Sequence, residues 1–150
     1  MSDHSVPPIP EKLAQWRSEG ETVELLDGQI WYHDQGPKSD DAVFFVHGYP
    51  GSSWDFQGVA ERIGSSARVV VMDQRGLGLS EKPLEGDYQS NFTMMRQADI
   101  FDALAAHLGL KSILLVAHDM GQTVGLELMA RYEEGRTPFR IRHAILLNGS

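Results

Sequence analysis

The sequence contains no cysteine among its 150 residues. This absence excludes disulfide bonds and zinc sites that are built on thiolates. The sequence also lacks any apolar run close to the ~20 residues that a membrane-spanning helix needs. Its start, Met1-Ser2-Asp3-His4, does not have the basic region and apolar core of a secretory signal. We therefore expect a cytoplasmic protein, and we expect neither a metal ion nor a cofactor.

Positive charge is scarce in this chain. It has 13 Lys and Arg against 21 Asp and Glu, which gives a net charge of -8. Such a balance argues against nucleic acid and against anionic membrane surfaces as partners. The length and the hydrophobic content of 41% are sufficient for one domain with its own core.

Apolar runs and their flanking residues predict an alternation of strands and helices. Asp27-Gly28 is a strong signal for a two-residue hairpin loop. The predicted strands are 22–26 and 29–33 around that loop, followed by 42–46, 68–72, 112–116 and 143–147. Helices are expected over 12–18, from a Ser52 cap to about 63, from an Asn91 cap to about 108, and directly after Asp119. This order predicts an α/β fold with a mostly parallel sheet and helices on both faces.

Three unusual loops follow the predicted parallel strands. They are His47-Gly48-Tyr49-Pro50, the stretch 73–80, and the turn at 117–121. Because the carboxyl ends of parallel strands meet at one edge of a sheet, these loops are expected to converge on a ligand site.

The turn at 117–121 places Asp119 between the small residues Ala117 and Gly121. This spacing is typical of a nucleophile elbow, a sharp strand-to-helix turn in which the strand and helix backbones approach closely. Asp119 is therefore a candidate nucleophile that forms an ester with its substrate. The alternative is a helix N-cap, in which the carboxylate accepts a hydrogen bond from the first-turn amides.

The three loops together resemble a known family. His47-Gly48-Tyr49-Pro50, Asp73-x-Arg75-Gly76-x-Gly78-x-Ser80 and His118-Asp119-Met120-Gly121 match, in order and spacing, the α/β-hydrolase branch of epoxide hydrolases and haloalkane dehalogenases. Ser52-Ser53-Trp54 and Asn148-Gly149 also resemble the mesoderm-specific transcript group of that superfamily. The resemblance covers 22–150 and implies the amino-terminal half of the core domain without its lid, while 1–21 form an amino-terminal extension.

The resemblance implies a role for each loop. Asp119 would attack a carbon of an epoxide or a carbon that bears a halogen, and the backbone amides of Tyr49 and Met120 would form the oxyanion hole. The residues His47, Gly48, Pro50, His118 and Gly121 would support this site.

Two histidines lie close to the expected nucleophile in the sequence. His47 is either part of a catalytic dyad or, as we favour, a structural residue whose ring binds backbone groups. By strand alternation His118 should face away from Asp119 and be partly buried rather than act as a base. Arg75 is expected to tie loops together, and Asp73 to anchor the same loop.

The residues beside Asp119 bear on the substrate. Haloalkane dehalogenases usually hold the halide with ring or amide N–H donors, which the side chains of Met120 and Tyr49 do not supply. Fluoroacetate dehalogenases carry arginines after the nucleophile, where this chain has Met120, Gln122 and Thr123. Elimination leaves a small apolar epoxide as the expected substrate, with an alkyl halide as the alternative. A non-catalytic binding module of the same fold is a further alternative.

The resemblance places the general base, a His with an acidic partner, beyond residue 150. We therefore expect a missing carboxy-terminal half, or a complementary chain, and no turnover by these 150 residues alone. The strand at 143–147 would otherwise leave an unpaired apolar edge.

Overall fold

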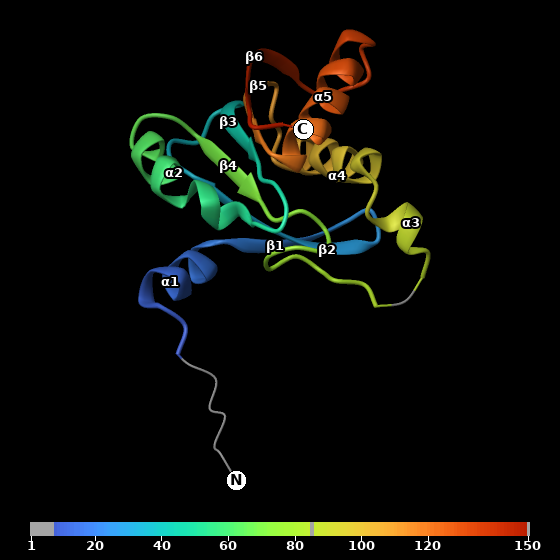
Figure 1. Cartoon of the computed structure of the whole chain (residues 1–150). Coiled ribbons are helices and arrows are strands. Elements are labelled where there is room, and N and C mark those ends of the chain that lie inside the picture. Colours follow the sequence, from blue (N-terminus) through green and yellow to red (C-terminus); the bar gives the residue numbers. More distant parts are fainter. Residues whose placement is uncertain (1–7, 85, 150) are drawn as a thin grey trace.

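The computed structural model describes residues 8–84 and 86–149, so that residues 1–7 of the expected amino-terminal extension lie outside the described part. The elements in chain order are α1 (Glu11–Glu19), β1 (Glu21–Leu25), β2 (Gly28–Gln35), β3 (Asp41–Val46), η1 (Ser53–Phe56), α2 (Gln57–Gly64), β4 (Val69–Met72), α3 (Tyr88–Asn91), α4 (Met94–His107), β5 (Ser112–His118), α5 (Met120–Glu133) and β6 (Arg140–Leu147). Figure 1 shows them as one twisted sheet with helices packed against it.

The six strands have the order β1-β2-β4-β3-β5-β6. The expected hairpin around Asp27-Gly28 joins the antiparallel strands β1 and β2, and β2 pairs antiparallel with β4. The pairs β4–β3, β3–β5 and β5–β6 are parallel. The chain therefore crosses over β3 between β4 and β5, which brings the carboxyl ends of β3 and β5 side by side at a switch in strand order.

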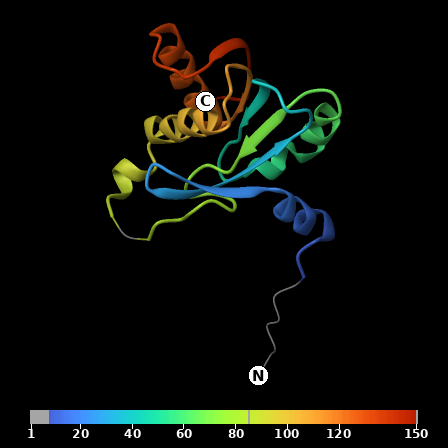
Figure 2. The same cartoon turned by 180° about the vertical axis from the view of Figure 1, so that it is seen from behind.

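Side chains of the central strands alternate between two hydrophobic cores. Phe44 and Leu115 belong to the core under α4 and α5, whereas Phe45 and Val116 belong to the core under α1 and α2. Figures 1 and 2 show these helix pairs on opposite faces of the sheet. The expected mostly parallel sheet with helices on both faces is thus confirmed, because near-continuous apolar runs are what a strand buried on both faces requires.

The helix boundaries differ from expectation at two places. Ser52 does cap a helix, but it accepts the Trp54 amide of the 3-10 turn η1, and α2 begins only at Gln57. The predicted Asn91 cap is wrong, since Asn91 ends α3 and the side chain of Thr93 accepts the Arg96 amide that opens α4. Several Asn, Ser and Thr residues precede the helix, and their local sequence does not decide between them.

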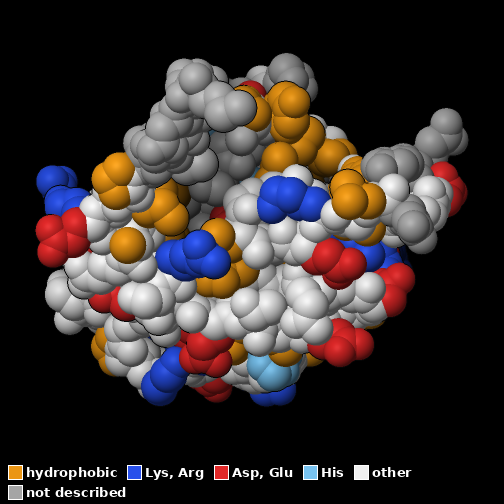
Figure 3. Space-filling model, turned by 90° about the horizontal axis from the view of Figure 1, so that it is seen from below, with side chains coloured by type: hydrophobic (Ala, Val, Ile, Leu, Met, Phe, Trp, Pro, Cys, Tyr) orange, Lys and Arg blue, Asp and Glu red, His pale blue; other side chains and the backbone are white. Residues whose placement is uncertain are grey.

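The strand predicted over 143–147 begins three residues earlier, at Arg140, and pairs with β5 on one side only among the described strands. Its side chains Ile145 and Leu147 are 46% and 42% exposed. Within the described residues, no helix is long and apolar enough to cross a membrane. On the face shown in Figure 3, acidic and basic side chains are interspersed and do not gather into a field of one sign.

Candidate active site

Asp119 lies at the junction of β5 and α5 with φ 55° and ψ -130°. A residue with a β-carbon adopts this backbone conformation only at a cost of about 1–3 kcal/mol, and such residues cluster at functional sites. The Asp119 side chain makes no capping hydrogen bond to α5. The alternative interpretation of Asp119 as an ordinary helix cap therefore does not fit the structure.

Two backbone amides favour the ionised form of the Asp119 carboxylate. The Tyr49 N–H donates to Oδ1 over 2.9 Å, and the adjacent Met120 N–H stabilises the negative charge. Hydrogen bonds from Met120 and then Tyr49 hold the pKa of this carboxyl below its ordinary value of 3.8. Asp119 is consequently an ionised carboxylate at neutral pH, with two N–H donors aimed at it.

Two glycines allow the loops to approach one another. A β-carbon at Gly48 would lie 2.4 Å from the Asp119 β-carbon, and one at Gly121 would lie 2.4 Å from the His47 carbonyl oxygen. Both distances are far below van der Waals contact, so the loop after β3 can lie against the β5–α5 turn only with glycine at these positions. Pro50 follows Tyr49 through a cis peptide bond and lines the hollow beside Asp119.

His47 is buried, and both of its ring nitrogens bind backbone groups. Nδ1 lies 2.8 Å from the Gly48 carbonyl oxygen, and the Gln74 N–H donates to Nε2 over 2.9 Å. Because Nε2 accepts, Nδ1 carries the proton in a neutral ring. Burial lowers the pKa of His47 below 6.5, in agreement with this tautomer. The ring thus joins the loop after β3 to the loop after β4, as its structural interpretation expected.

Asp73 anchors the loop after β4 in the way that was expected. Its carboxylate accepts the Ser53 N–H over 2.7 Å and the Leu79 N–H over 2.6 Å. Arg75 is buried and lies 3.5 Å from Asp27, in the β1–β2 turn. Sequence reasoning missed Gln97 of α4, whose amide binds both the N–H and the carbonyl of Arg75. The sequence feature that could have indicated this contact is a single glutamine on the apolar side of the predicted helix.

His118 is the last residue of β5. It is half-buried and lines the same hollow of about 340 Å³ as Asp119 and Asp55. The alternation holds only while the backbone is extended, and the positive φ of Asp119 ends it.

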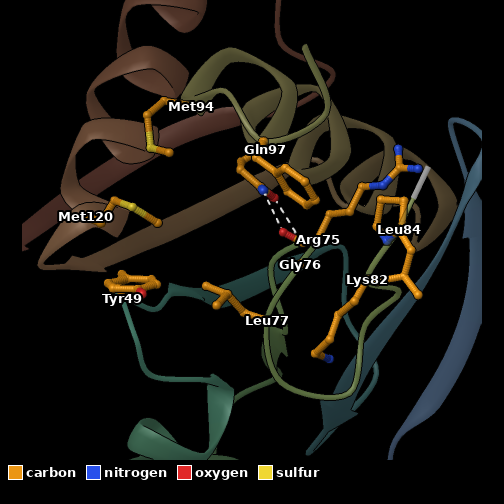
Figure 4. Close-up of a pocket in the computed structure, with 11 residues that line it drawn as sticks. Tyr49, Arg75, Gly76, Leu77, Lys82, Leu84, Met94, Gln97 and Met120 are labelled. Atoms are coloured by element: carbon orange, nitrogen blue, oxygen red, sulfur yellow. Dashed lines mark hydrogen bonds between the residues drawn. The ribbon is translucent and has the colours of Figure 1, made fainter. Parts of the chain in front are cut away.

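A second, larger cavity of about 430 Å³ lies on the other side of Tyr49 and Met120 (Figure 4). Leu77 from the loop after β4 and Met94 from the first turn of α4 line it together with these two residues. The Tyr49 side chain is 66% exposed and borders both hollows. In the described part of the chain, no group of three or more His, Cys, Asp or Glu residues could hold a metal ion.

Known proteins resemble this chain in sequence and in structure. It is 37% identical over 138 residues to a putative hydrolase, LipZ, of Mycobacterium tuberculosis, a match that covers 92% of this chain and 46% of the relative. It is 35% identical to the mesoderm-specific transcript homolog protein of Bos taurus, over 97% of this chain and 44% of that protein. The chain therefore spans about half the length of these relatives, and the resemblance to the mesoderm-specific transcript group is confirmed.

A solved epoxide hydrolase from Vigna radiata superimposes with a TM-score of 0.73 at 29% identity, over 85% of this chain and 39% of that one. A family model described as the alpha/beta hydrolase fold matches residues 41–150. That range contains β3, β5 and the three converging loops. The chain belongs to the α/β-hydrolase fold family.

Proposed function

We propose that the protein is a hydrolase in which Asp119 attacks a small apolar epoxide and forms a covalent alkyl ester. Family membership and the epoxide hydrolase among its structural neighbours support the reaction class. The observation that carries the assignment of Asp119 is the pair of amides, from Tyr49 and Met120, on its carboxylate.

The position of these amides matters because the ester carbonyl is built from Asp119 itself. Oδ2 attacks an epoxide carbon, the carbon–oxygen bond of the ring breaks, and the ring oxygen takes up a proton. Water then attacks Cγ of the ester, and the negative charge of the tetrahedral intermediate collects on Oδ1. The Tyr49 N–H already lies 2.9 Å from that oxygen. In this proposal the Tyr49 N–H stabilises the oxyanion without having to move.

Hydrolysis of the ester also needs a base that deprotonates the attacking water. His118 is the imidazole that shares the hollow with Asp119, whereas both nitrogens of His47 are engaged by backbone. By family resemblance the base is a later histidine. We propose that the 150 residues alone form the ester and that turnover requires the remaining half of the protein or a complementary chain.

The test is intact-mass analysis after incubation with 1,2-epoxyhexane, applied both to the 150-residue chain and to the full-length protein. We expect one adduct, located on Asp119 by peptide mapping, that persists in the 150-residue chain and is hydrolysed by the full-length protein. Asp119→Asn should form no adduct, while Asp55→Asn is the matched control for a carboxylate in the same hollow. Sustained turnover by the 150-residue chain would contradict the requirement for a second half, and loss of that turnover in His118→Gln would identify His118 as the base.

An alkyl halide is the alternative substrate, because attack of Oδ2 on a halogen-bearing carbon gives the same ester. The side chains of Tyr49 and Met120 provide no N–H donor for the leaving halide. We therefore expect 1-bromohexane to alkylate Asp119 at least about tenfold more slowly than the epoxide, an order of magnitude that corresponds to the ~1.4 kcal/mol of one good hydrogen bond. A folded, full-length protein that gives no adduct with either reagent would instead support a non-catalytic binding module.

A further inference from the structure

The cavity of about 430 Å³ beside the elbow is distinct from the hollow that contains the Asp119 carboxylate. Six of the residues that line it are apolar: Leu77, Pro83, Leu84, Phe92, Met94 and Met120. They come from the loop after β4, the approach to α4 and its first turn, and the first residue of α5. Its volume lies within the ~300–1,000 Å³ of small-molecule sites, which are mostly apolar with few polar groups.

The charged side chains in the wall of this cavity are directed to protein acceptors. The Lys82 ammonium hydrogen-bonds to the carbonyl oxygens of Gly78 and Ser80. The Arg75 guanidinium contacts Asp27, although its buried Nε has no hydrogen-bond partner. The Gln97 amide is used on the Arg75 backbone. Most of these polar donors thus already have protein acceptors, and the remaining wall is apolar and suits a neutral alkyl chain.

Two residues, Tyr49 and Met120, lie between this cavity and the Asp119 carboxylate. Tyr49 and Met120 line the cavity with their side chains, and their backbone amides bind the Asp119 carboxylate. In Figure 4, Tyr49, Met120 and Met94 stand at one side of the cavity, and Lys82 and Leu84 at the other. A ligand in the cavity therefore has one end against Tyr49 and Met120, the two residues that flank Asp119.

We propose that this cavity binds one unbranched, neutral alkyl chain of the substrate and presents the carbon at its end to Asp119. The inference rests on the proposed function for the reaction at Asp119, whereas the binding of the chain is a separate property of the cavity. Unbranched chains fit because Leu and Met side chains line the space from several directions and adapt to a flexible ligand. The protein then discriminates substrates by chain length.

Binding is measured by calorimetry on the full-length Asp119→Asn variant, which cannot form the ester, with 1-butanol, 1-hexanol and 1-octanol as probes. We expect affinity to rise about fourfold for each methylene that enters the cavity, since burial of a methylene contributes ~0.8 kcal/mol. Octanoate should bind more weakly than 1-octanol at pH 7. Affinity that does not change with chain length, or tighter binding of octanoate, would overturn the proposal.

Leu77→Trp fills the cavity, and Leu79→Trp is the matched control on the same loop, since Leu79 is 39% exposed and does not line the cavity. We expect Leu77→Trp to weaken 1-octanol binding at least tenfold and to slow alkylation of Asp119 by 1,2-epoxyoctane relative to propylene oxide by a similar factor. Leu79→Trp should change neither quantity more than twofold. Equal effects of the two variants would overturn the proposal.

Met94→Trp fills the cavity from α4 and provides a second variant if Leu77→Trp does not fold, as judged by near-ultraviolet circular dichroism. The two hypotheses fail in different ways. If no epoxide alkylates Asp119 while alcohols still bind according to chain length, the proposed reaction is wrong and the chain-binding site stands.

Discussion

Two residues of this site, Asp119 and His47, differ in charge because their surroundings differ. Asp119 is partly exposed and stays ionised because amides bind its carboxylate. His47 is buried and stays neutral because burial disfavours the imidazolium and the Gln74 N–H occupies its acceptor nitrogen. The neutral ring of His33 follows the same rule, since burial beside Trp16 and Trp31 lowers its pKa below 6.5.

These lowered histidine pKa values predict that stability falls in mild acid. Below about pH 6.5 the unfolded chain binds protons at His33 and His47 while the folded rings remain neutral. The free energy of unfolding therefore decreases as the pH falls, until the pH is below the folded pKa values. Each group contributes at most ~1.4 kcal/mol per pH unit. Urea unfolding at pH 7.5, 6.0 and 5.0 measures this slope.

We expect His47→Gln to flatten that pH dependence and the exposed His143→Gln to leave it unchanged. His33→Gln should remove the remaining part of the slope. If the slope of His47→Gln equals that of the unsubstituted protein, His47 is not neutral in the folded state.

At the scale of elements, α4 and α5 cover the same face of the sheet and are joined by one buried arginine. The Arg131 guanidinium of α5 donates to Asp99 and Asp102 of α4 over 2.8 and 2.9 Å, and it also binds Glu127 and the Met95 carbonyl. Its side chain is only 9% exposed. Because α5 begins at the elbow, this contact fixes the far end of the helix that carries the Met120 amide.

Arg131→Met should destabilise the protein by about 1–3 kcal/mol. Loss of a buried cation leaves its carboxylates without their partner, a change that costs ~3–5 kcal/mol when the whole pair is buried and less here, because Asp99 is 43% exposed. The comparison is Arg136→Met, whose surface pair with Glu134 should contribute less than ~1 kcal/mol. Chemical unfolding measures the free energy of unfolding of both variants. An equal loss of stability in the two would contradict the role of Arg131 in holding α4 and α5 together.

The sequence predicts most of this fold because the central strands β3, β4 and β5 are largely buried on both faces and end at loops that contain glycine. The convergence of His47, Asp73 and Asp119 follows from parallel strand order alone. The Thr93 cap, the Gln97 bridge and the Arg131 cluster do not follow, since each depends on contacts between segments distant in sequence.

At the scale of the whole molecule, β6 forms one edge of the described sheet. It has unpaired backbone groups on its outer side and exposed Ile145 and Leu147 side chains. Such an edge is a template for pairing with another strand. The proposal that a further half of the protein, or a complementary chain, covers it is consistent with relatives about twice as long.

The 150-residue chain should therefore associate as its concentration rises, and Ile145→Lys should keep it monomeric by placing a charge on the edge strand. Leu126→Lys is the matched control, because Leu126 is 47% exposed but lies on α5. Sedimentation velocity over a hundredfold range of concentration measures the association of each variant. Association that both substitutions suppress equally would indicate a general hydrophobic surface rather than strand pairing.

Tyr49 and Met120 each serve the site twice, with the backbone toward Asp119 and with the side chain toward the cavity. Every residue except proline has an amide N–H, so replacement of these side chains leaves both backbone N–H groups in place. In the proposed enzyme, evolution or a combinatorial library could therefore reshape substrate preference at positions 49 and 120 without giving up the catalytic donors. The same pair of positions would be the economical starting point for redesign.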